Sequence, residues 1–149
     1  MIHFVDVNLK NIFEQGKEYP WIRPKVCPNC NHFKVWSHGF VARYFYGFTD
    51  SLYMKCYRCP ECHCVITCRP NTHFPKVRCE KAQIRTSLAT RIAMLLWPIT
   101  HFLTSRMRYW MRNFKKKAVA RLTMAWDQGL MAAFDKLLDM GIVHVSRST

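Results

Sequence analysis

Acidic side chains are scarce in this chain, which has 9 Asp and Glu residues against 23 Lys and Arg and a formal net charge of +14 at pH 7. A two-metal nuclease site needs several carboxylates brought together. Asp127, Asp135 and Asp139 lie on one amphipathic segment, where we expect them to be solvated rather than convergent. The sequence therefore predicts that the protein is not an enzyme.

The chain also lacks a long hydrophobic run. The longest, Ile92 to Leu103, is interrupted by Pro98 and by polar residues, and it falls short of the roughly 20 apolar residues of a membrane span. The N-terminal MIHFVDVNLK has no basic start followed by an apolar stretch, so we expect no signal peptide. Without an export signal, the eight cysteines favour metal-bound thiolates in a reducing cytoplasm over disulfides.

Two short cysteine knuckles, Cys27-Pro-Asn-Cys30 and Cys59-Pro-Glu-Cys62, are the most informative pattern that is present. Paired C-x2-C motifs supply the four sulfurs of a tetrahedral structural zinc site. We expect one structural Zn²⁺ per chain, bound by Cys27, Cys30, Cys59 and Cys62. Since four thiolates leave no open coordination position, the ion should hold the fold together and not react.

Other cysteines leave two alternatives open. Cys56 and Cys59 have the same spacing as a knuckle, although the Pro60-Glu61 pair matches the Pro28-Asn29 pair of the first knuckle and favours Cys59 with Cys62. A second metal set would use Cys64, Cys68, His73 and Cys79. Its irregular spacing fits no compact knuckle, so buried apolar thiols are the simpler interpretation.

The two knuckles, the β-forming runs after the first knuckle and the helical spacing of apolar residues after residue 80 predict a small α+β fold. In it, an N-terminal four-cysteine zinc ribbon of short antiparallel strands precedes an α-helical region that is a candidate helix-turn-helix. The expected parts are an irregular lead-in that packs on the ribbon (1–26), the ribbon (27–79), a basic helical region (80–117), and an amphipathic packing or dimerisation helix with a tail (118–149).

Local patterns place elements within these parts. Strands are expected near 40–46 and 51–58, with turns at Gly39 and Gly47, and helices over 80–96, about 104–117 and 118–140. Asn31 and His63 follow the knuckles, where the chain turns through positive φ, and Asn and His tolerate that conformation better than most residues.

The excess positive charge is localised. Residues 80–117 carry nine basic and one acidic residue and 27–79 carry seven and two, whereas 118–149 has three of each. A localised basic face is typical of nucleic-acid binding, with Arg bonding to phosphates or guanine edges and Lys contacting phosphates. The candidate contacts are Arg106, Arg108, Arg112, Lys115, Lys116 and Lys117 on the helix, with Arg43, Lys55 and Arg58 on the ribbon strands.

Several short motifs follow one another between residues 13 and 80: QGKEYPW at 15–21 before the first knuckle, SHGF with Arg43-Tyr44 at 37–44, and YRCPEC at 57–62. In this order they resemble short zinc-ribbon proteins encoded beside transposases in bacterial mobile elements, and the N-terminal ribbons of insertion-sequence transposases. The resemblance implies DNA binding in transposition, with a helix-turn-helix over 81–114. The helical half departs from that pattern, because Trp97-Pro98 stands where the turn usually has Gly.

We therefore expect a DNA-binding accessory or regulatory protein of a transposon or other mobile element, in the bacterial cytoplasm at the nucleoid. Double-stranded DNA is the expected partner, with a transposase or recombinase and a second copy of the chain, through 118–140, as further candidates; no membrane is expected. Two alternatives stay open. One is an adaptor that docks such an enzyme through the ribbon and the Trp126–Leu138 helix. The other is an RNA-binding ribbon that stacks bases on Tyr44, Phe45 and Tyr46.

Overall fold

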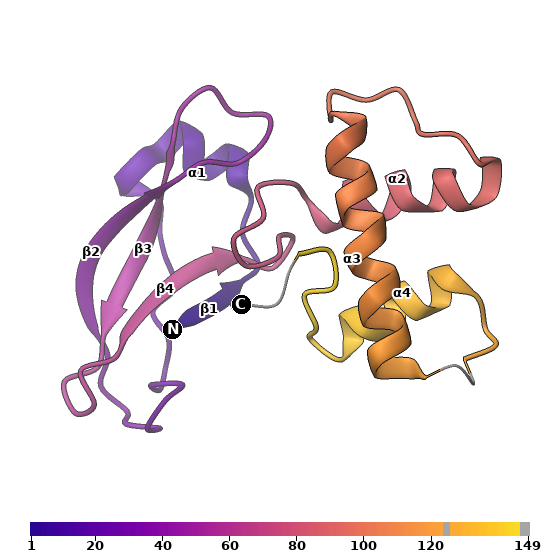
Figure 1. Ribbon diagram of the computed structural model, residues 1–149. Helices are drawn as coiled ribbons and strands as arrows, with labels where there is room; N and C mark the ends of the chain where they lie inside the picture. The colour runs from indigo at the N-terminus through magenta and orange to yellow at the C-terminus, as the bar shows by residue number, and fades with distance from the viewer. Residues whose placement is uncertain (124–125, 147–149) are drawn as a thin grey trace. The chain divides into compact units, whose positions relative to one another are not determined.

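The computed structural model describes residues 1–123 and 126–146 and divides into two units, Met1–Arg78 and Cys79–Thr149. The described part contains one four-stranded mixed sheet in the first unit and four α-helices, one in the first unit and three in the second (Figure 1). The fold is therefore small α+β, as the sequence predicts.

The sheet has the strand order β1-β4-β3-β2. Its antiparallel part consists of β2 (Trp36–Arg43), β3 (Leu52–Arg58) and β4 (Val65–Pro70), and β1 (Ile2–Val5) runs parallel to β4 at one edge. Along β3, alternation buries Leu52, Met54 and Cys56 on one face. Gly39 lies within β2 at a shift of register between Ser37 and Phe40, so the prediction of a turn there is wrong.

The segment 1–26 is only partly irregular, whereas the sequence predicts an irregular lead-in over its whole length. Besides β1 it contains α1 (Leu9–Gln15) and a 3-10 turn, Gly16–Glu18. The Asn8 side chain caps α1 by accepting a hydrogen bond from the Lys10 amide over 2.8 Å. The apolar side of α1 is buried against β3. The first unit has one core cluster around α1 and Met54 and another around Tyr57 and Ile66, and Trp21 packs against both, which is the predicted packing of the lead-in.

The second unit is built from α2 (Lys81–Met94), α3 (Thr104–Leu122) and α4 (Leu130–Asp139) (Figure 1). The predicted helix over 118–140 is wrong, because residues 118–122 continue α3 and α4 begins only at Leu130. The backbone has a positive φ after the end of α3 and before the start of α4, 61° at Thr123 and 84° at Gly129. The buried stripe of α3 contains Met107, Trp110, Met111, Phe114 and Ala118.

The connection between α2 and α3 bears on the expected helix-turn-helix. It spans residues 95–103, whereas a helix-turn-helix joins its helices by roughly three or four residues. The chain therefore lacks that tight turn between α2 and α3. Each described helix is also too short or too polar to cross a membrane.

His144 is buried in the core of the second unit. Its ring lies 4.1 Å from the ring centroid of Phe134 and 5.6 Å from that of Phe114, and Nδ1 lies 2.9 Å from the Ile142 carbonyl oxygen. Burial lowers the pKa of His144 below 6.5, and this outweighs the hydrogen bond to Ile142, which raises it. Among nearby charges, Lys117 and Lys81 lower that pKa and Asp135 raises it.

We expect this histidine to make the second unit less stable in acid. Above about pH 7.5 the His144 imidazole is neutral in both the folded and the unfolded chain. As the pH falls through about 6.5, the imidazole becomes protonated in the unfolded chain but stays neutral in the folded chain. Stability then falls by at most about 1.4 kcal/mol per pH unit until the folded pKa is reached. Amide hydrogen exchange of α3 and α4 measures the change, and His144→Gln should flatten it. If His144→Gln lost as much stability at low pH as the unmodified protein, the pH dependence could not come from His144.

Candidate metal centre and nucleic-acid interface

The two knuckles are tight turns with matching backbone hydrogen bonds. The Cys27 amide donates to the carbonyl oxygen of His32 over 2.8 Å, and the Cys59 amide donates to that of Cys64 over 3.1 Å. In each knuckle the amide of the first cysteine thus bonds to the carbonyl oxygen five positions later. The first knuckle precedes β2, and the second lies between β3 and β4.

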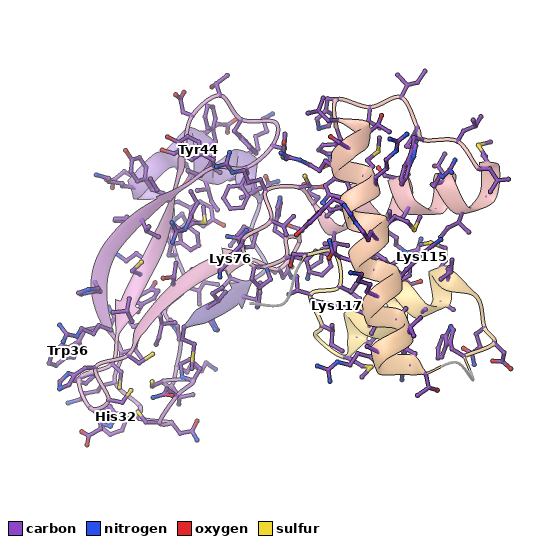
Figure 2. The ribbon with its side chains drawn as sticks, viewed as in Figure 1. His32, Trp36, Tyr44, Lys76, Lys115 and Lys117 are labelled. Carbon is purple, nitrogen blue, oxygen red and sulfur yellow. The ribbon has the colours of Figure 1, made fainter. Side chains whose placement is uncertain are left out.

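The residue after each knuckle has a left-handed backbone, with φ 58° at Asn31 and 56° at His63. This confirms the prediction from the sequence. Figure 2 shows His32 and Trp36 at the end of the sheet where sulfur atoms gather.

The four knuckle cysteines bring their sulfurs together. The Sγ atoms of Cys27 and Cys62 are 3.6 Å apart, those of Cys30 and Cys59 are 3.5 Å apart, and all four lie within 4.8 Å of one another. Four thiolates about 2.3 Å from a tetrahedral Zn²⁺ would be about 3.8 Å apart. The cluster therefore has the size and the donors to hold one metal ion.

The four thiols also affect one another's protonation. Hydrogen bonds from the Asn29 side chain and the Cys64 backbone lower the pKa of Cys62 to about 6. A backbone hydrogen bond involving His32 lowers the pKa of Cys30, but desolvation and the neighbouring thiols outweigh it and raise that pKa to about 12. Without a cation, the negative charge of the first thiolate disfavours ionisation of the neighbouring thiols. A bound divalent ion would stabilise all four as thiolates.

The remaining cysteines lie elsewhere. Cys56, the alternative ligand, is buried in β3 with its Sγ 3.6 Å from the Thr67 hydroxyl oxygen, and it is outside the cluster. In the first unit, Cys64, Cys68 and His73 form no second cluster within the described residues. Burial raises the pKa of Cys68, and likewise of Cys79 in the second unit, to about 11, so both remain neutral thiols. The structure therefore supports the interpretation as buried thiols for Cys68 and Cys79, whereas Cys64 is only partly buried.

Four of the seven basic residues of α3 gather on one side of the helix. Arg108, Arg112, Lys115 and Lys116 line a hollow of about 560 Å³, together with Arg91 of α2, Trp97 and Met111. Arg108, Arg112 and Lys115 follow one another at spacings of four and three residues, which keeps them on one face of α3. Lys116 borders that face, and the apolar stripe of α3 is buried. Neither ion pair of the described residues, Lys10–Glu14 nor Arg85–Asp135, includes any of these cations.

Two of the predicted helix contacts have partners inside the second unit. Lys117 also lies on α3 (Figure 2) and donates a hydrogen bond to the carbonyl oxygen of Val143, which ties the C-terminal segment to the helix. Arg106 hydrogen-bonds to Cys79 and lowers the pKa of that thiol, against the larger effect of burial. Arg91 was missed by sequence reasoning; its guanidinium lies 5.4 Å from the Trp97 ring centroid.

The predicted contacts on the ribbon strands do not form one patch. Arg43 and Arg58 are exposed at opposite ends of the β2–β3 pair. Lys55 is half-buried, with Nζ 4.2 Å from the ring centroid of Phe40. The expected stacking triad is also divided. Phe45 is buried against His73, and Tyr44 is exposed beneath the Arg78 guanidinium.

Comparisons of this chain with family models, with curated proteins and with solved structures find no match.

Proposed function

We propose that the protein binds double-stranded DNA through the cationic face of α3, and that Cys27, Cys30, Cys59 and Cys62 hold one structural Zn²⁺ that stabilises the first unit. Zinc fits the donor set, because four thiolates are typical of structural zinc sites, whereas Mg²⁺ and Ca²⁺ prefer oxygen ligands. The resemblance of residues 13–80 to mobile-element zinc ribbons extends the proposal to an accessory or regulator of transposition, acting at the bacterial nucleoid with a transposase or recombinase.

The single observation that carries DNA binding is the set of cations on α3 and Arg91 around a hollow that no carboxylate lines. Phosphates supply the missing anions, and counterion release makes their binding favourable without any particular base sequence. The helix has 19 residues, so it is about 28 Å long. A major groove about 12 Å wide admits such a helix without requiring a helix-turn-helix.

Salt dependence tests this proposal. If five cations (Arg91, Arg108, Arg112, Lys115 and Lys116) meet phosphates, the logarithm of the association constant should fall with the logarithm of salt concentration with a slope of about −4.5. Fluorescence anisotropy with a labelled duplex of about 25 base pairs, between about 50 and 300 mM salt, measures the slope. A slope near zero would contradict phosphate binding by α3.

A second candidate function, the enzyme-docking adaptor, is favoured by one observation. The last residue of α2, Met94, and the connection to α3 expose apolar side chains, and exposed apolar patches are typical of protein interfaces. Those of the connection are Leu95, Leu96, Ile99 and Leu103. The helix first expected to dock is less suitable, because Ala133, Phe134 and Leu137 of α4 are buried within the second unit. Retention of a co-purified DNA-processing enzyme by a variant that no longer binds DNA would favour the adaptor.

A further inference from the structure

A second hollow, of about 360 Å³, lies in the first unit between the β2–β3 pair and the segment 17–23. Its volume falls within the range of roughly 300–1,000 Å³ that ligand sites occupy. The register pairs Phe40 with Lys55 and Ser37 with Tyr57, so these side chains form adjacent rows on one face of the strands. The shift of register between Ser37 and Phe40, with Gly39 at φ 90°, lies directly beside the hollow.

The opposite wall is fixed to the sheet. The Tyr57 hydroxyl donates to the carbonyl oxygen of Trp21 over 3.5 Å, and the Tyr19 and Trp21 rings meet edge to face at 5.1 Å. Trp21 also packs against both core clusters. The aromatic wall is therefore part of the folded unit and is present before any ligand binds.

The hollow combines aromatic rings with uncompensated cations. Lys17, Arg23 and Lys55 line it, no Asp or Glu does, and none of the three takes part in an ion pair of the described residues. The Lys55 ammonium lies 4.2 Å from the Phe40 ring centroid and 6.0 Å from that of Tyr57. A ring face cannot use all three N–H donors of an ammonium, so donors remain for an anion.

We propose that this hollow binds one unpaired nucleotide, whose base stacks on the aromatic wall at Tyr19 and whose phosphate is bound by Lys55, Arg23 and Lys17. A nucleotide combines a planar base with a negatively charged phosphate. Its base can stack on the aromatic rings of the hollow, and its phosphate can bind the basic side chains. The nucleotide comes either from a single strand or from solution. The site contains no residue of α3, so its test is independent of whether α3 binds duplex DNA.

The experiment uses the zinc-loaded full chain with Arg108→Glu and Arg112→Glu, which weakens competing binding by the cationic face of α3. The probes are hexathymidylate, AMP and inorganic phosphate, titrated while NMR follows the Trp21 indole Nε1–H. In the described structure this group is buried and has no hydrogen-bond partner. We expect hexathymidylate or AMP to shift this signal and the Ser37 amide at concentrations where phosphate does not.

Tighter binding of hexathymidylate than of AMP assigns the site to a single strand, and equal or tighter binding of AMP assigns it to a free nucleotide. Phosphate binding as strong as that of AMP would overturn the role of the aromatic wall. No shift with any probe would overturn the site, whether or not the unmodified chain binds duplex DNA.

Matched variants test the named residues. Lys55→Met keeps the aliphatic stem over Phe40 and should weaken binding about fivefold, and Tyr19→Leu should weaken it about tenfold by removing stacking. Lys34→Met is the control, because its ammonium also lies over a ring, 5.7 Å from the Phe33 centroid, but outside the hollow. Each variant is first shown to keep its zinc. Equal affinities for Lys55→Met and Lys34→Met would refute the assignment of the phosphate site.

Discussion

Removal of the metal ion is expected to unfold the first unit and to leave the second folded. Structural zinc contributes about 10–16 kcal/mol in zinc-finger peptides, which is as large as the roughly 5–15 kcal/mol that stabilises a whole domain. Cys27 and Cys59 are fully buried in the same cluster as Val35, Tyr57 and Ile66, so loss of the ion exposes the core as well as the knuckles. The second unit has its own buried residues and contributes no ligand to the cluster.

The measurement is zinc stoichiometry together with an amide NMR spectrum, before and after treatment with a strong chelator. Cys59→Ser should lose the ion and the dispersed signals of β2 to β4, while the signals of α3 remain. Cys56→Ser is the matched control, because it is three residues away in the alternative register and its sulfur only approaches Thr67. A folded, metal-free Cys59→Ser protein, or loss of zinc in Cys56→Ser instead, would refute the ligand set.

Local patterns in the sequence were sufficient to predict the four-cysteine cluster that could hold a metal ion. Each knuckle spans four residues, so spacing alone places its two sulfurs, and the left-handed backbones at Asn31 and His63 follow from the same turn. The choice of Cys62 over Cys56 also depended on neighbouring residues only. By contrast, β1 could not be predicted, because its stability comes from parallel pairing with β4, whose residues lie about 65 positions away, as in Ile2 with Thr67.

The strand β4 was missed for a different reason. Arg69 and Pro70 end it, and both residue types argue against a buried strand. In the fold, the buried Arg69 guanidinium donates to the carbonyl oxygens of Phe74 at 3.1 Å and Val77 at 2.7 Å and so organises the following loop. The sequence shows that a basic side chain is present, but not whether that side chain hydrogen-bonds within the protein or is available to a ligand. The same limit applies to Lys117 and Arg106, which were predicted to face DNA and have partners within the second unit.

Reversal of two charges on α3 is expected to weaken DNA binding about 100-fold at about 0.15 M salt. Arg108 and Arg112 are both exposed, line the same hollow, and form no ion pair with the protein in the described residues. Loss of two phosphate contacts reduces the salt slope by about 1.8 in magnitude. The two introduced carboxylates add repulsion from the phosphates, which accounts for the rest of the expected loss.

The matched control for this variant is Arg121→Glu with Lys136→Glu, which changes the net charge equally at exposed positions of the second unit outside the hollow. If a diffuse positive field held the DNA, the two double variants would lose affinity to the same extent, because the field depends on net charge. If the hollow binds phosphates, the control loses little and keeps a slope of about −4.5, while Arg108→Glu with Arg112→Glu falls to about −2.7. Equal losses and equal slopes would therefore refute a defined DNA-binding face on α3, even with the zinc site and both units intact.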